Sequence, residues 1–242
     1  DEAEASYTQA IALKSDFAQA HYNFGITLQE LGRLDEAEAS YTQAIALKPD
    51  YAEAHNNLGN TLQELGRLDE AEASYTHAIA LKPDYAHAYY NLGEVYKITG
   101  KHSEAVKCFE KTLELSSVDL MGATLQLAIL GKREMPDKTP EPYMQEFYKK
   151  KSKGWNDIAW QKGKYRGHIL IEKAFKQTHN TSKKVNILDL GCGTGSLARF
   201  LRPYARTLVG VDLSPDMLFK AQQIDLYDSL HKKDLIQYLG EV

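Results

Sequence analysis

Apolar residues in the first half of the chain recur at the three- and four-residue intervals that place them on one face of a helix. In one such stretch this stripe consists of Leu34, Ala37, Tyr41, Ala44 and Ile45. Gly32 precedes the stretch and Pro49 follows it, and both residue types end helices. The pattern therefore predicts a helix over residues 18–31, a turn, and a second helix over residues 35–47.

This helical pattern is repeated almost letter for letter. The segment DEAEASYTQAIALK at residues 1–14 recurs unchanged at residues 35–48, and again at residues 69–82 with His77 in place of a glutamine. A fixed period of 34 residues is typical of a solenoid of stacked helix pairs. Gly25 and its equivalents fall in mid-helix, where glycine costs about 1 kcal/mol relative to alanine. We therefore expect another helix to approach closely at these glycines.

The recurring residues resemble those of the tetratricopeptide repeat. In one unit they are His55, Leu58, Gly59, Ala71, Tyr75, Ala78 and Pro83. The resemblance covers residues 1–115 and implies an all-α tetratricopeptide solenoid. The first unit contributes only its second helix, so we expect the chain to begin within a repeat.

One polar position recurs in the first helix of each unit. The motifs HYNFG, HNNLG and YYNLG place Asn23, Asn57 and Asn91 at equivalent positions, which would form a ladder in stacked units. Asparagine offers both donors and acceptors, which suit the backbone of an extended peptide. Tetratricopeptide proteins of the glycosyltransferase type use such a ladder, so we predict a protein or peptide partner in this groove. The alternatives are asparagines that only cap or hydrate a helix face, and an array used for spacing or self-association.

The composition changes after the repeats. Residues 123–134 are still helical in pattern and are expected to cap the solenoid, which gives a repeat domain over residues 1–134. Three prolines predict an extended linker over residues 135–142. The remaining residues, 143–242, are expected to form a second domain.

The second domain opens on a basic and aromatic segment. Lysines at residues 149–151 and 153 would suit nucleic acid, but the whole chain is acidic and no nucleic-acid fold signature accompanies them, so we expect no nucleic-acid partner. We predict instead a helix that covers a neighbouring cofactor site. The aromatic residues of this segment would form the packing face of that helix, or would simply belong to the core of the domain. They are Tyr148, Trp155, Trp160 and Tyr165.

Strand-like patterns follow near the C-terminus. KVNILDL is a short apolar run, GCGTG comes next, and SLARFLRPYA is helical in pattern with Ser196 as its N-cap. TLVGVDL is a second strand that ends at Asp212, and Pro215 begins another helix. The order of strand, glycine loop, helix, strand and acid is typical of the first half of a nucleotide-binding βαβ unit.

The spacing of the glycines separates the possible cofactors. Gly191, Gly193 and Gly195 alternate, whereas a dinucleotide fingerprint has the spacing GxGxxG. Asp189 precedes them, and its carboxylate would repel a pyrophosphate but attract a cationic amino acid or sulfonium. Asp212 suits ribose hydroxyls, which nicotinamide and adenosyl cofactors share. The alternatives are a nicotinamide enzyme and glycines that only form a turn.

This loop resembles the first motif of class I S-adenosylmethionine-dependent methyltransferases. With VGVDLSPDML behind it, the resemblance extends to bacterial predicted methyltransferases that carry tetratricopeptide repeats. It implies an incomplete α/β Rossmann-like domain with S-adenosylmethionine as cofactor. The cofactor-binding residues that it implies are Asp189, Gly191, Cys192, Gly193, Thr194, Gly195, Asp212 on the ribose, Leu213 and Met217 on the adenine, and Asp234 near the adenine amino group. The Cys192 thiol and Phe175 are expected only to pack.

At most three strands are expected, near residues 185–190, 207–212 and 231–235, whereas the sheet of these enzymes has seven. We therefore expect a chain truncated at both ends, with an exposed edge on its first strand. Such a fragment is expected to be inactive without its missing half, because the residues that position the methyl acceptor would lie there. No catalytic residue and no acceptor can be named.

Composition narrows the remaining classes. The chain has 242 residues and a net charge of −4, and no apolar run approaches the roughly 20 residues that span a membrane. Cys108 and Cys192 are its only cysteines, which predicts neither a disulfide framework nor a metal site and favours the cytoplasm. We predict an S-adenosylmethionine-dependent methyltransferase with a protein-binding repeat array. The alternative is a non-catalytic tetratricopeptide scaffold for protein–protein interaction.

Overall fold

The structure is a computed structural model that describes residues 2–13, 16–152, 167–178 and 183–241. The chain divides into two compact units, residues 1–138 and 139–242, which are treated separately below. Trp155, Trp160 and Tyr165 lie outside the described residues.

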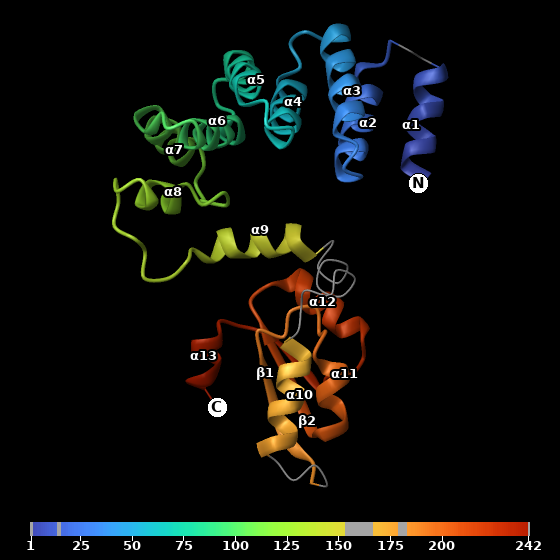
Figure 1. The fold of residues 1–242 in the computed structure, drawn as a ribbon, viewed down its shortest axis with the longest axis vertical. Coiled ribbons are helices and arrows are strands. Elements are labelled where there is room, and N and C mark those ends of the chain that lie inside the picture. The colour runs from blue at the N-terminus through green and yellow to red at the C-terminus, as the bar shows by residue number, and fades with distance from the viewer. Residues whose placement is uncertain (1, 14–15, 153–166, 179–182, 242) are drawn as a thin grey trace. The chain divides into compact units, whose positions relative to one another are not determined.

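The first unit consists of helices that follow one another in chain order (Figure 1). They are α1 (Glu2–Leu13), α2 (Ala18–Glu30), α3 (Leu34–Leu47), α4 (Ala52–Glu64), α5 (Leu68–Leu81), α6 (Ala86–Ile98), α7 (His102–Leu115) and α8 (Ala123–Ile129). Three hairpins, α2 with α3, α4 with α5 and α6 with α7, are the predicted helix pairs. The all-α solenoid is therefore confirmed.

The mid-helix glycines lie against aromatic rings of the paired helix. A Cβ atom added to Gly59 would lie 2.6 Å from the Tyr75 ring, and one added to Gly25 would lie 2.6 Å from the Tyr41 ring. The third pair places Gly93 against Phe109, where the corresponding distance is 2.8 Å. Real Cβ atoms do not approach so closely, so the predicted close approach of the two helices is confirmed.

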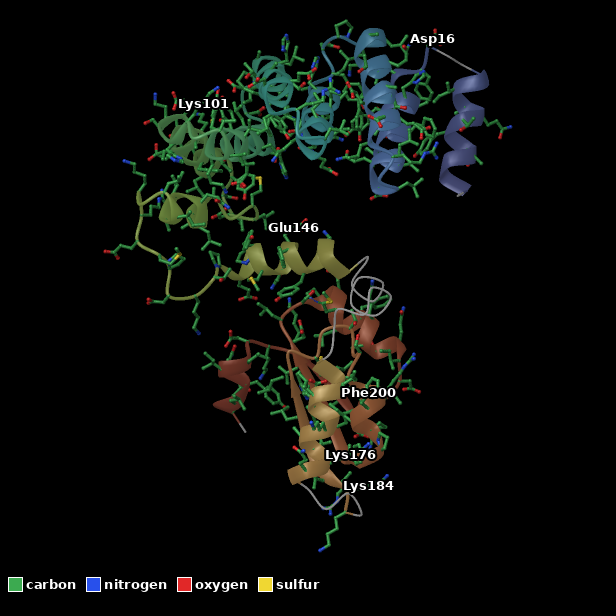
Figure 2. The ribbon with its side chains drawn as sticks, in the orientation of Figure 1. Asp16, Lys101, Glu146, Lys176, Lys184 and Phe200 are labelled. Atoms are coloured by element: carbon green, nitrogen blue, oxygen red, sulfur yellow. The ribbon has the colours of Figure 1, made fainter. Side chains whose placement is uncertain are left out.

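Successive repeats are also joined by polar contacts. Lys101, labelled in Figure 2, pairs with Glu72 at 2.7 Å, and Arg67 pairs with Glu38 of the preceding repeat at 2.6 Å. Exposed ion pairs contribute little individually. Their repetition at the same spacing nevertheless shows that these two interfaces use equivalent positions for an ion pair.

The second unit combines helices with a small sheet (Figure 1). Its elements are α9 (Glu141–Ser152), α10 (Gly167–Thr178), β1 (Val185–Leu190), α11 (Ala198–Leu201), a 3₁₀ turn (Arg202–Tyr204), β2 (Ala205–Asp212), α12 (Pro215–Gln223), β3 (Ser229–Lys232) and α13 (Leu235–Leu239). The strands are parallel in the order β1-β2-β3. Ile187 and Leu208 from the sheet pack against Ala198 and Leu201 of α11.

Several boundaries differ from those expected. The third strand is Ser229–Lys232 rather than 231–235, because the Asp234 side chain caps α13 by accepting hydrogen bonds from the amides of Ile236 and Gln237. Ser196 is not an N-cap: α11 begins only at Ala198, since the left-handed Gly195 turn and the residues after it precede the helix. The first helix of this unit begins at Glu141, inside the expected linker.

Within the described sheet, β1 pairs only with β2 and forms one edge. Leu188 and Leu190 on this strand are 37% and 39% exposed, which is unusual for apolar residues of a parallel sheet. The expected exposed edge on the first strand is thus present in the described part of the unit.

Candidate functional site

The glycine loop connects β1 to α11 and runs beside the end of β2. Gly191, Gly193 and Gly195 have φ angles of 73°, 54° and 78°, in the left-handed region that favours glycine. The amides of Gly191 and Cys192 donate to the carbonyl of Val211 at 2.8 and 3.1 Å. These bonds hold the loop over the carboxyl end of the parallel sheet, which is where ligands bind in open α/β folds.

Asp212 at the end of β2 completes the loop. One of its carboxylate oxygens accepts from the amide of Gly193 and the other from the amide of Ser214, each at 2.9 Å. A carboxylate oxygen can accept more than one hydrogen bond. The group is therefore fixed in orientation while keeping capacity for ligand hydroxyls.

A cavity of about 360 Å³ lies over this loop. Eight of the ten residues named from the sequence line it, namely Gly191, Cys192, Gly193, Thr194, Asp212, Leu213, Met217 and Asp234. A Cβ atom added to Gly191 or Gly193 would meet nothing within 4 Å, so the backbone there is open to a ligand. The wall thus combines an acidic hydrogen-bond acceptor with apolar side chains, a lining suited to a ligand that carries hydroxyls and a flat ring.

The rest of the wall comes from residues that the loop motif does not include. Met144 and Tyr148 of α9 line the cavity, together with Ser196, Leu197 and Leu235. In the sequence, the only local signal for this part of the wall is the four-residue spacing of Met144 and Tyr148, which places both on one face of a helix. Helix α9 therefore lies beside the cavity, in the region for which the sequence predicts a covering helix.

Asp189 and Gly195 are the two named residues that do not line the cavity. Asp189 is 7% exposed and accepts a hydrogen bond of 2.6 Å from the hydroxyl of Tyr227. Burial raises the pKa of its carboxyl; the hydrogen bond from Tyr227 offsets part of this rise, and the charge of Asp212 adds to it. Successive residues of a strand point to opposite faces, and here Asp189 is buried whereas Leu190, the next residue of β1, is exposed.

Cys192 lies in the loop but lacks the properties of a nucleophile. Burial, followed by the charges of Asp212 and Asp189, raises the pKa of its thiol to about 12. The reactive thiolate is therefore scarce at neutral pH. A packing role, as the sequence suggested for this thiol, agrees with that environment.

The asparagine ladder of the first unit is partly engaged within the protein. Asn57 donates to the hydroxyl of Tyr22 at 3.2 Å, and Asn91 donates to the side-chain oxygens of Asn60 at 2.9 Å and Asn56 at 3.1 Å. Each partner belongs to the preceding repeat. Because a carboxamide has two donors and two acceptor lone pairs, these bonds leave part of its capacity for a ligand.

Family models agree with this division of the chain. Models described as tetratricopeptide repeat match residues 6–39 and 50–117, and one described as TPR repeat matches residues 28–66. A model described as methyltransferase domain matches residues 187–235, which include the glycine loop, Asp212 and Asp234.

Individual relatives match shorter or partial segments. Two uncharacterised methyltransferases of Schizosaccharomyces pombe are 45% identical over 47 residues and 39% identical over 49 residues. These segments are 19% and 20% of this chain but only 18% and 15% of the relatives' lengths. A crystal structure of MamA is 25% identical with a TM-score of 0.51, and the match covers 61% of this chain and 88% of that one.

The chain is therefore a protein of tetratricopeptide repeats and a methyltransferase domain. The repeats form the first unit, and the glycine loop and its sheet belong to the methyltransferase domain. Among the described residues, no helix is both long and apolar enough to cross a membrane.

Proposed function

We propose that this chain binds S-adenosylmethionine in the cavity over the glycine loop and serves methyl transfer to an acceptor that its repeats help to recruit. The observation that carries the proposal is the joint placement of open glycine backbone at Gly191 and Gly193 with the fixed carboxylate of Asp212. The match to a methyltransferase domain over residues 187–235 supports it.

The residues of the cavity would divide the binding between them. The bound cofactor would supply a sulfonium methyl group for an in-line displacement. Asp212 would accept hydrogen bonds from the ribose hydroxyls, while Leu213 and Met217 would pack on the adenine, and Asp234 would lie near its amino group. Met144 and Tyr148 would close the cavity from α9 and exclude water. Orientation of this kind can contribute about 7–11 kcal/mol to such a reaction.

Titration calorimetry with S-adenosylmethionine tests the cofactor. Wild-type chain is expected to bind, and Asp212→Ala is expected to weaken binding at least about tenfold, because hydrogen bonds to a charged group contribute roughly 1.5–3 kcal/mol each. Asp216→Ala is the matched control, since it removes the same charge four residues away and off the cavity wall. No binding by wild type at millimolar cofactor would exclude cofactor use by this chain.

The contribution of α9 is tested by a second pair of variants. Tyr148→Ala removes an aromatic side chain from the cavity wall and is expected to weaken cofactor binding. Tyr143→Ala is the control. The Tyr143 side chain lies on the same helix and contacts Phe147, but it does not line the cavity. Equal affinities in the two variants would exclude Tyr148 from the binding site.

The recruiting role of the repeats would use the asparagine ladder formed by Asn23, Asn57 and Asn91. Peptides selected from a random display library with the full chain are expected to lose binding in Asn57→Ala. Tyr22→Phe is the control, because it breaks the same hydrogen bond between repeats but keeps the Asn57 carboxamide. Unchanged binding in Asn57→Ala would place the peptides on another surface.

A non-catalytic scaffold is the second candidate, favoured by the extent of the repeats, whose family models together reach from residue 6 to residue 117. Peptide binding through the asparagine ladder without cofactor binding in the calorimetry would select it.

A further inference from the structure

The side chain of Tyr227 lies between two glycines. A Cβ atom added to Gly195, the third glycine of the loop, would lie 3.1 Å from one edge of the Tyr227 ring. One added to Gly210, in the middle of β2, would lie 2.9 Å from the other edge. Both glycines therefore leave room for the same ring. This explains why Gly195 packs inward while Gly191 and Gly193 border open space.

The hydroxyl of this ring reaches a buried carboxylate. Tyr227 donates to Asp189 at 2.6 Å, and within the described residues Asp189 has no cationic partner. Burial raises the pKa of the tyrosine, which keeps its proton on the donor side of the bond. A buried acceptor that loses its donor is costly, so this hydrogen bond determines where both side chains lie.

The residue after Tyr227 is fixed to β2 by its backbone and its side chain. The amide of Asp228 donates to the carbonyl of Leu208 at 2.9 Å, and the Asp228 carboxylate accepts from the amide of Leu208 at 2.6 Å. Arg202 donates to the same carboxylate at 2.7 Å. The ring is thus carried by a segment that is attached to the sheet independently of the glycine loop.

We propose that Tyr227 is a positioning residue that holds the glycine loop from the side opposite the cavity. It does so through ring contact at Gly195 and through its hydrogen bond to Asp189. The acid of the motif then acts through Tyr227 rather than by touching the ligand, which agrees with its absence from the cavity wall. The effect on the cofactor rests on the proposed function, whereas the effect on the loop does not.

The cofactor arm of the test measures the affinity of S-adenosylhomocysteine by calorimetry on the full chain, at a temperature where circular dichroism shows each variant folded. Tyr227→Phe and Asp189→Ala are each expected to weaken binding about tenfold, the scale of one hydrogen bond to a charged group. The double variant is expected to be no weaker than the weaker single variant. Asp189→Asn keeps an acceptor oxygen and is expected to restore binding.

Two results of this arm would overturn the proposal. Losses that multiply in the double variant would mean that Asp189 contacts the ligand independently of Tyr227. Unchanged affinity in Tyr227→Phe would mean that the hydroxyl does not position the loop. Tyr204→Phe is the control, because it also removes a tyrosine hydroxyl from this unit. Among the described residues, that hydroxyl has no hydrogen-bond partner.

A second arm separates this proposal from the proposed function. Hydrogen exchange of peptides covering residues 191–197 is measured without ligand, and Tyr227→Phe is expected to accelerate it while Tyr204→Phe does not. Faster exchange in a chain that binds no S-adenosylhomocysteine would support the positioning role of Tyr227 and exclude the proposed cofactor binding. Unchanged exchange would overturn the positioning role whatever the ligand result.

Discussion

Both units place glycine against an aromatic ring, but they do so in different ways. In the repeats the same contact occurs in three successive hairpins, with Gly59 against Tyr75 as one example. In the methyltransferase unit the ring of Tyr227 serves two glycines at once and also carries a buried hydrogen bond.

The glycine–aromatic contacts of the repeats are redundant, whereas several parts of the methyltransferase unit depend on one ring. A defect in one repeat leaves the neighbouring hairpins with their own contacts, because each repeat interacts mainly with the adjacent ones. A defect at Tyr227 alters the third loop glycine, a glycine of β2 and the acid of the motif together. The two units should therefore respond differently to the same kind of substitution.

The largest expected effect is in the repeats. Tyr75→Ala removes a fully buried ring and is expected to cost about 3–5 kcal/mol of unfolding free energy. Tyr41→Ala should cost about the same, because its contact with Gly25 is equivalent. Urea unfolding followed by circular dichroism at the helix band measures both. Costs that differ by several kcal/mol would show that the repeats are not energetically equivalent.

A smaller effect distinguishes the glycines of the loop. Gly191→Ala and Gly195→Ala both force a left-handed residue, at a cost of about 1–2 kcal/mol. Gly195→Ala also meets Tyr227, Ile224 and Ala221, and such overpacking adds roughly 1–3 kcal/mol. Tryptophan fluorescence during urea unfolding reports on this unit, which contains both tryptophans of the chain. Equal costs would mean that the packing at Gly195 is loose.

Turn glycines of the repeats should be less sensitive still. Gly66 has a φ of 79° and open space around its Cα, so Gly66→Ala is expected to cost only about 1–2 kcal/mol. Asparagine tolerates this conformation better, so Gly66→Asn should recover part of the loss. Urea unfolding followed by circular dichroism at the helix band measures the stability of both variants. An alanine variant as stable as wild type would contradict the role of the left-handed turn.

The smallest effect concerns pH. The folded pKa of Asp189 is raised above the ordinary aspartate value of 3.8, so the native state binds its proton more tightly than the unfolded state. Stability from this group is therefore present below that value and falls as pH rises through the folded pKa. Asp189→Asn has no carboxyl to titrate and so lacks this loss. The unfolding free energy of the variant minus that of wild type should therefore increase as pH rises from about 4 to 7.

Fluorescence-monitored urea unfolding at several pH values checks this expectation. Tyr227→Phe serves as the comparison, because it keeps the titrating carboxyl but removes its donor. A difference between Asp189→Asn and wild type that stays constant over this pH range would show that Asp189 is not responsible for the slope.

Features encoded by local sequence were predictable. The period of 34 residues determined the helix pairs, and the mid-helix Gly59 signalled the close approach of another helix. The order of strand, loop and strand likewise placed Asp212 next to the glycine loop. In each case the decisive information lies within one repeat or one βαβ unit.

Features that depend on distant partners were not predictable. The hydrogen bond from Tyr227 to Asp189 joins residues that are 38 positions apart, and the glycine motif carries no signal of it. Met144 reaches the cavity from a helix that lies outside the βαβ unit. The start of α13 at Asp234 was predictable in principle, because aspartate before an apolar run is a good N-cap, but the strand pattern was favoured instead.

The uniform contact between successive repeats has a consequence for how this array can change length. A copy of residues 49–82 inserted after Lys82 would carry its own glycine–tyrosine contact and would repeat the ion pairs to the hairpins on either side of it. The array can thus gain or lose whole 34-residue modules while keeping these contacts, with α8 still at its end. The side-chain hydrogen bonds would adjust, because the copied Asn57 would meet Asn56 where Asn57 itself meets Tyr22.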